Sequence, residues 1–217
     1  YDDTIDMFML NTDGTLSNQF YVLNNYNQVF KCLSNNNGSN SIVQPYFEPG
    51  TYGSNNIFIG SDGYKWKFMY TIDSGMKLKF MDSSWMPVPV GLNTPNSFLA
   101  PAGAGNIDVI NITNGGSGYD IVNNSITVTV TGDGSTVATG TIDVTQVVGG
   151  VIKDITVTNT GKNYTFANVT ISSSVGTGAT AICPVSPIGG HAWDPISELG
   201  CTRIMISIEF EGSESGV

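Results

Sequence analysis

Few of the side chains that commonly carry out catalysis occur in this sequence. His191 is its only histidine, so a Ser-His-Asp relay or a histidine-based metal site would have to be built around it. The residues near it are Gly189, Gly190 and Trp193, with no nucleophile motif beside them. Because such chemistry needs several converging partners, we interpret His191 as a loop or packing residue.

The carboxylates are also poorly arranged for catalysis. Hydrolysis of a glycosidic bond needs two acids fixed across a cleft. Asp2, Asp3 and Asp6 are close together but lie at the start of the chain. Three further aspartates fall at expected turns or strand edges, where this residue is ordinary turn chemistry: Asp62, Asp133 and Asp143. We therefore expect no enzyme.

Cofactor and metal motifs are missing from the glycine-rich stretches. TNGGSG at 113–118 and TGDGST at 131–136 lack the lysine, the following Ser or Thr and the helix of a phosphate loop. The spaced acidic ligands of a calcium loop are missing around Asp133. The three cysteines, Cys32, Cys183 and Cys201, form neither a CxxC motif nor a disulfide framework. The sequence predicts no cofactor and no metal.

The composition narrows the class of protein. Only 12% of the 217 residues are charged, and the net charge is -10 with a pI near 4.2. A basic stripe for nucleic acid is therefore not expected. No apolar run approaches the ~18 residues needed to cross a bilayer. Reduced cysteines are typical of proteins that fold in a cytoplasm.

An aromatic strand is the strongest element of the first half. In SDGYKWKFMYTI, residues 61–72, alternation places Tyr64, Trp66, Phe68, Tyr70 and Ile72 on one side. Such a face is usually the core of a sheet. The alternative is a platform on which sugar rings stack, and the exposure of Trp66 distinguishes the two.

Other elements surround this strand. Residues 20–33 read as a hairpin whose turn is rich in asparagine. Asp73 is a candidate N-cap for one short helix, and Asp194 for another that ends at Gly200. Alternating isoleucines predict a half-buried strand over 204–210, which we expect to lie beside the aromatic strand.

A tandem repeat occupies the middle of the chain. ITNGGSGYDIVNNSITV from Ile112 matches VTNTGKNYTFANVTISS from Val157, and each unit reads as strand, glycine turn, tyrosine and further strands. We expect the two copies to pack on each other as a small β module inserted over 105–184. The positions that match at one constant offset are Asn114 and Asn159, Gly116 and Gly161, Tyr119 and Tyr164, and Ile126 and Ile171.

Four stretches outside the repeat resemble a known family. NQVFKCLSNNNG, SDGYKWKFMYTI, KFMDSSWMPV and GGHAWDPISELG occur in the order and spacing of the small wedge subunit of the baseplate in T4-type contractile-tailed phages, particularly the version of marine relatives. The resemblance covers about 1–100 and 187–211. The repeat is similar to the GSGY-type β repeats of phage structural proteins. Its second copy departs from that pattern, with Lys162 and Asn163 in place of Ser117 and Gly118.

The resemblance implies a fold and a function. It implies a mainly β chain, a layered antiparallel β-sandwich with short helices in loops, whose core is formed by 1–100 and 187–217. It also implies that the family's N-terminal region, which precedes YDD, is missing here. The candidate core or interface residues are Tyr64, Trp66, Phe68, Tyr70, Trp85 and Trp193.

The expected role is structural. The resemblance implies a virion subunit of the tail baseplate, assembled in the host cytoplasm, that pairs with itself as a homodimer and binds other wedge proteins without catalysis. A β-rich carbohydrate-binding or adhesin module is the alternative, because the repeat and the aromatic content would suit a glycan ligand. A polysaccharide-degrading tail enzyme is a third reading.

Overall fold

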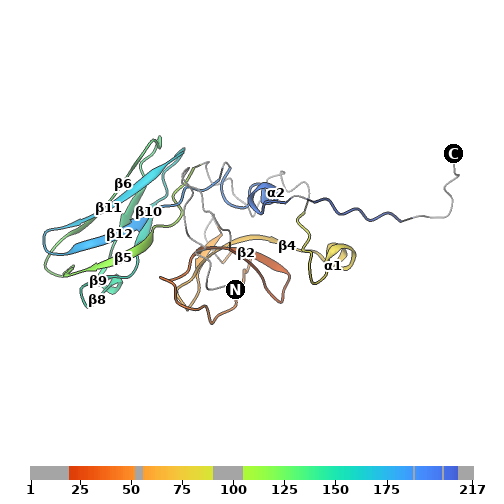
Figure 1. The fold of residues 1–217 in the computed structure, drawn as a ribbon, viewed down its shortest axis with the longest axis horizontal. Helices are drawn as coiled ribbons and strands as arrows, with labels where there is room; N and C mark the ends of the chain where they lie inside the picture. Colours follow the sequence, from red (N-terminus) through yellow and green to blue (C-terminus); the bar gives the residue numbers. More distant parts are fainter. Residues whose placement is uncertain (1–19, 52–55, 90–104, 188, 202, 210–217) are drawn as a thin grey trace.

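The fold is mainly β, with antiparallel sheets and, among the described residues, two short α-helices, which confirms the predicted fold class. The computed structural model describes residues 20–51, 56–89, 105–187, 189–201 and 203–209. Figure 1 shows a sheet region, formed by β1–β4 with helices α1 and α2, next to an elongated repeat region formed by β5–β12.

The sheet region contains one four-stranded antiparallel sheet. Its order is β1-β2-β4-β3, and the strands are β1 Tyr21–Leu23, β2 Gln28–Ser34, β3 Ile57–Ile59 and β4 Lys65–Thr71. The predicted asparagine turn joins β1 and β2. Within it Asn27 has a φ of 58°, and the Asn24 side chain accepts a hydrogen bond from the Gln28 N–H at 2.9 Å. The predicted hairpin is confirmed.

Both faces of β4 are buried, and its aromatic residues do not share one face. Tyr64, Trp66 and Phe68 join one hydrophobic cluster, whereas Tyr70 and Ile72 join another cluster on the opposite face. The prediction of a single aromatic face was wrong for the last two residues. The register with β2 shifts at this point, because one residue is inserted between Phe68 and Tyr70. Such a β-bulge moves the following side chains to the other side of the sheet.

The two helices begin where the sequence predicts. The Asp73 carboxylate caps α1, Ser74–Phe80, by accepting from the Met76 N–H at 2.9 Å. The Asp194 carboxylate caps α2, Pro195–Glu198, and the chain leaves this helix through Gly200 at a φ of 64°. Each cap satisfies an N–H that the first helical turn leaves without a partner.

The predicted strand over 204–210 is absent from the described part of that segment. Arg203–Glu209 is extended but is assigned to no strand, and every residue in it is exposed. It projects from the end of α2 away from the rest of the chain (Figure 1). Alternation predicts that one face of a strand is apolar, but it does not show whether the same chain supplies a neighbouring strand. Residue 210 lies outside the described residues.

The repeat region has three small sheets. The orders are β10-β7-β6-β11, β12-β5 and β8-β9, and their facing sides enclose one hydrophobic cluster. The longer strands are β5 Asn111–Ser117, β6 Ile126–Gly132, β7 Thr139–Thr141, β10 Thr156–Asn159, β11 Ala167–Ser173 and β12 Thr177–Ile182. A short β8–β9 hairpin, Val147–Val148 and Val151–Ile152, follows a single 3-10 turn at Val144–Gln146.

The two copies of the repeat exchange strands. The first copy contributes β5, β6 and β7, and the second contributes β10, β11 and β12. The middle strands β6 and β11 pair with each other, the first strand β5 pairs with the third strand β12, and the first strand β10 pairs with the third strand β7. Each copy therefore completes its sheets with strands of the other copy. The prediction that the copies pack on each other is confirmed in this form.

The repeated tyrosines have equivalent positions. Tyr119 and Tyr164 are each 5% exposed. The Tyr119 hydroxyl accepts from the Ala179 N–H at 3.2 Å, and the Tyr164 hydroxyl accepts from the Ala138 N–H at 2.9 Å. Each ring therefore packs in the core of the region, while its hydroxyl accepts from a backbone N–H of the other copy.

The repeated turns have the same backbone conformation, although the second copy has Asn163 where the first has Gly118. Gly116 and Gly161 have φ values of 63° and 64°, and each N–H binds the side chain of the asparagine two residues earlier. Gly118 has a φ of 74° and Asn163, its counterpart, has a φ of 60°. Asparagine tolerates this left-handed conformation better than most residues, so the second copy keeps the turn without that glycine.

Polar contacts join the two regions. The Lys65 ammonium binds the Asp154 carboxylate at 2.8 Å, and the Asn111 side-chain amide donates to the Leu33 carbonyl at 2.9 Å. Lys65 itself is only 8% exposed. The repeat region thus supplies the carboxylate partner of a buried lysine of the sheet.

Candidate functional site

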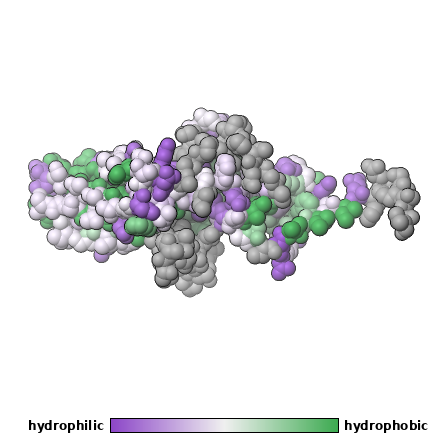
Figure 2. Space-filling view, turned by 90° about the horizontal axis from the view of Figure 1, so that it is seen from above, coloured by the Kyte–Doolittle hydropathy of each residue, from purple (hydrophilic) through white to green (hydrophobic). Residues whose placement is uncertain are grey.

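The end of the molecule farthest from the repeat region exposes apolar side chains. Ile204, Ile206 and Ile208 are 88%, 77% and 68% exposed. They alternate along the projecting segment Arg203–Glu209, so an extended backbone places them on one side. Figure 2 shows hydrophobic residues along this segment.

The base of the segment contacts the loop that follows α1. The Arg203 guanidinium lies over the Trp85 ring, 5.1 Å from its centroid. Trp85 is 43% exposed, and Leu78 of α1 is 88% exposed. Figure 1 places α1 at this same end of the molecule. We refer to Leu78, Trp85 and Arg203–Glu209 together as the contact end.

A buried group of charges lies next to α2, from which the segment leaves. The Glu198 carboxylate binds the Lys31 ammonium at 2.6 Å and His191 Nδ1 at 2.6 Å. Its second oxygen accepts from the Ala192 N–H at 2.7 Å. His191 Nε2 lies 3.9 Å from the Asp108 carboxylate, which comes from the start of the repeat region. We refer to Lys31, Asp108, His191 and Glu198 as the ionic cluster.

Two members of the ionic cluster, Lys31 and His191, keep Glu198 ionised. Burial alone would raise the pKa of Glu198, but His191 and Lys31 outweigh it and lower this pKa to about 2. Nearby, burial lowers the pKa of Lys67 to about 8, and the carboxylates of Asp108 and Glu198 partly oppose that change. Glu198 is thus held ionised between two partners, which fixes α2 on the sheet.

The arrangement of the ionic cluster suits a structural role. Each of its side chains is at most 9% exposed, and Glu198 is already bound by Lys31, His191 and a backbone N–H. A general acid or base must instead reach a substrate proton. Within the described ranges, no three His, Cys, Asp or Glu side chains are grouped in a way that could hold a metal ion.

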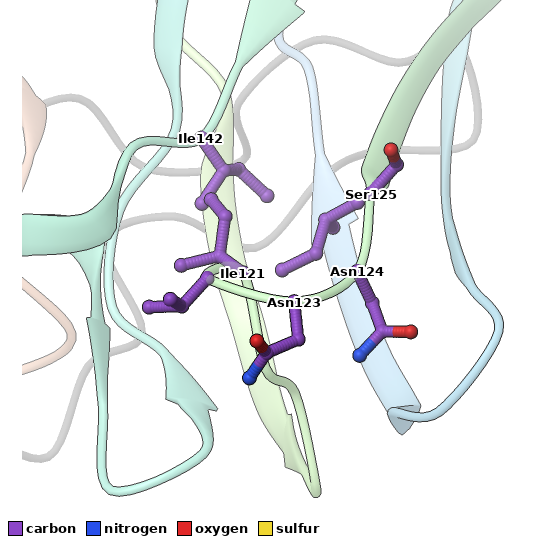
Figure 3. A pocket seen from close by; sticks show the side chains of 7 residues that line it. Ile121, Asn123, Asn124, Ser125 and Ile142 are labelled. Carbon is purple, nitrogen blue, oxygen red and sulfur yellow. The ribbon is translucent and has the colours of Figure 1, made fainter.

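An open hollow lies on the repeat region. It has a volume of about 390 Å³ and lies beneath the loop that precedes β6. Figure 3 shows Ile121 and Ile142 beside Asn123, Asn124 and Ser125 at its wall. None of its lining residues is aromatic, so it offers no ring on which a sugar could stack.

The structure separates the predicted site residues. Tyr64, Trp66, Phe68 and Tyr70 lie in the sheet core, and Trp66 is only 2% exposed, which excludes the sugar platform on this strand. Trp193 is half-buried. Of these candidates, Trp85 alone lies at the contact end. The repeat positions Gly116, Tyr119, Gly161 and Tyr164 shape turns and core of the repeat region.

Sequence reasoning missed the ionic cluster. The His191 side chain is 9% exposed and contacts Glu198, which is compatible with a loop or packing residue. Lys31 and Glu198, however, are 167 positions apart, and nothing in their local sequence links them. The available signal was the position of Lys31 and Lys67 between apolar residues of the expected strands, since buried charges require partners.

Comparisons with known proteins found no match among family models, curated proteins or solved structures. No helix in the described part of the chain is long and apolar enough to span a membrane.

Proposed function

We propose that this chain is a non-enzymatic structural subunit of a phage virion, a component of the tail baseplate wedge that assembles through protein–protein contacts. The observation that carries the proposal is the contact end, where three isoleucines of an extended segment are exposed together. The resemblance of the sequence to wedge subunits is the reason for proposing the baseplate wedge as the assembly.

Exposed alternating isoleucines are costly in water. Burying each one would contribute about 1.5–3 kcal/mol, and a soluble protein seldom exposes such residues together unless a partner covers them. An extended segment with unpaired backbone groups can also join a partner's sheet as an added strand. Both properties suit a subunit of a permanent assembly.

Other features of the chain support the same role. Cys32, Cys183 and Cys201 are free thiols in the structure, which suits assembly in the host cytoplasm. A low charged fraction of 12% suits interfaces that depend on neutral hydrogen-bonding side chains and on apolar contact. The carbohydrate-binding alternative has less support, because Trp66 is buried and the hollow lacks an aromatic lining.

The test is co-expression with the other wedge subunits encoded by the same phage, followed by analytical ultracentrifugation. We expect the chain to sediment within a wedge complex and Ile206→Asp to be lost from it. Val122→Asp is the matched control, since Val122 is 75% exposed on the repeat region. A chain that sediments alone beside an assembled wedge, or equal loss with both variants, would refute the proposal.

A further inference from the structure

The sequence of the projecting segment is complementary to itself. It reads Arg203, Ile204, Met205, Ile206, Ser207, Ile208 and Glu209. We propose that this segment pairs in antiparallel register with the same segment of a second copy, with Ile206 on the two-fold axis. The proposal deepens the proposed function, because it names one partner of the contact end.

The register follows from charge and apolar matching. With Ile206 opposite its own copy, Arg203 of one chain lies opposite Glu209 of the other, and Ile204 lies opposite Ile208. Directly opposed residues in an antiparallel pair are in contact, and opposite charges there are favourable. A symmetric dimer forms each of these contacts twice, as an isologous interface requires.

Other arrangements of two copies fit less well. A parallel in-register pair would place each Arg203 beside Arg203 and each Glu209 beside Glu209, and like charges opposite each other are destabilising. A shift by one residue, for instance with Ile206 opposite Ser207, would place Ile204 opposite Glu209 and so lose both the isoleucine pairs and the Arg203–Glu209 pairs. The antiparallel register centred on Ile206 avoids both problems.

The contact end also offers a surface, at the base of the pair, for the face that carries Arg203. Two strands alone are marginally stable in water and need an apolar body to pack on. Trp85, 43% exposed, lies at the base of the segment, and Leu78, 88% exposed, belongs to α1 at the same end of the molecule (Figure 1). The Arg203 guanidinium already lies over the Trp85 ring, and a planar guanidinium can stack on a ring while it pairs with a carboxylate.

The pairing predicts a complementation experiment on the whole chain. Light scattering over a range of concentrations should show a dimer for the unmodified protein. Arg203→Glu alone places two glutamates opposite each other twice per dimer, and Glu209→Arg alone does the same with arginines. We expect each single variant to weaken the dimer about tenfold or more.

Mixing the two single variants should restore the dimer. Each chain then supplies the charge that the other lacks, so opposite charges face each other at both ends of the pair. A dimer that neither single variant weakens, or a mixture that stays as weak as its components, would overturn the proposed register. Glu48→Arg, an exposed charge reversal in the sheet region, is the control and should leave the dimer unchanged.

A disulfide test locates the two-fold axis. In a Cys201→Ser background, Ile206→Cys places two thiols opposite each other, whereas Ser207→Cys places each thiol opposite Met205. We expect rapid oxidation to a covalent dimer with Ile206→Cys and not with Ser207→Cys, because a disulfide needs Cα atoms within about 7 Å. Equal crosslinking of both variants would contradict the two-fold at Ile206.

The two proposals can fail separately. If the charge variants do not affect the dimer but Ile206→Asp is still lost from the wedge complex, the segment binds a different wedge subunit and only the pairing is wrong. If mixing the two single variants restores the dimer but the chain never sediments with wedge subunits, the pairing holds and the baseplate role is wrong.

Discussion

The sheet region and the repeat region hold together in different ways. In the sheet region, segments that are far apart in sequence converge on one ionic cluster, in which Lys31 and Glu198 are 167 residues apart. In the repeat region, the same contact is made twice, as with the hydroxyls of Tyr119 and Tyr164. The sheet region depends on non-local charge contacts that each occur once, whereas the repeat region divides its polar contacts between two equivalent places.

This difference predicts which single substitutions cost the most stability. Loss of one charge in the ionic cluster leaves its partner buried and unpaired, which is among the most costly single changes in a protein. Loss of one repeated contact leaves its counterpart in place. The three tryptophans, Trp66, Trp85 and Trp193, all lie outside 105–184, so tryptophan fluorescence follows the sheet region while circular dichroism follows both.

The largest effect is expected for Lys31→Met. This change leaves Glu198 buried with His191 as its remaining side-chain partner, and we expect the sheet region to lose about 3–5 kcal/mol of its free energy of unfolding. Urea unfolding followed by tryptophan fluorescence measures this loss. Lys79→Met, on an exposed lysine of α1, is the control; an equally small effect of both would show that the cluster does not stabilise the sheet region.

Acid should weaken the sheet region through Glu198. Its pKa is about 2 in the folded chain against an ordinary value of 4.5, so its contribution is complete above pH about 4.5 and is lost as the pH falls towards 2. The shift corresponds to a contribution on the order of 3 kcal/mol. Fluorescence-detected urea unfolding between pH 5 and pH 2 should show this slope, and Glu198→Gln should reduce it.

A smaller slope should remain in the Glu198→Gln variant. Hydrogen bonds from Ser41 and from backbone N–H groups lower the pKa of Asp62 despite the opposing effect of its slight burial, and those from Ser197 lower the pKa of Asp194. An unchanged slope in the variant would mean that Glu198 does not carry the acid sensitivity of this region.

The repeated tyrosines should give two moderate and similar effects. Tyr119→Phe and Tyr164→Phe each remove the acceptor of one backbone N–H, at a cost of about 1–2 kcal/mol. The Ala138 N–H is buried and its bond is shorter, 2.9 Å against 3.2 Å for Ala179, so Tyr164→Phe should cost slightly more. Thermal unfolding by circular dichroism tests this, and an effect confined to one copy would contradict their equivalence.

The smallest effect is expected at the turn where the copies differ. Gly118→Asn introduces the residue that the second copy uses at Asn163, and the nearest atom to an added Cβ, the Val175 carbonyl oxygen, is 3.5 Å away. We expect a change of less than about 0.5 kcal/mol. Gly118→Val should cost more than about 1 kcal/mol, because a β-branched residue strongly disfavours positive φ. Equal costs would show that the turn is not set by backbone conformation.

Features encoded over a few residues could be predicted from the sequence. The hairpin turn, the caps at Asp73 and Asp194 and the repeated turns depend on residues within one turn of each other, and all of them occur in the structure. The duplication also predicted that the copies pack together, because matched positions such as Tyr119 and Tyr164 recur at one offset.

Features that depend on distant residues could not be predicted. The bulge that moves Tyr70 to the opposite face depends on the register with β2, and no local pattern encodes that register. The ionic cluster joins Lys31 to Glu198 only after the chain has folded. At Arg203–Glu209 the alternation was recognised, but its partner is not among the described strands of the chain.

The exchange of strands between the repeat copies bears on the origin of the region. A single copy would leave its first strand without a neighbour, since β5 pairs only with β12 and β10 pairs only with β7, in each case a strand of the other copy. Two separate chains carrying one copy each could form both of these strand pairs as a dimer. The short hairpin of β8 and β9, which turns at Gly149 and Gly150, lies in the link that makes this pair one polypeptide. A chain cut at that hairpin should therefore remain associated, with the two halves held together by every long strand pair of the region.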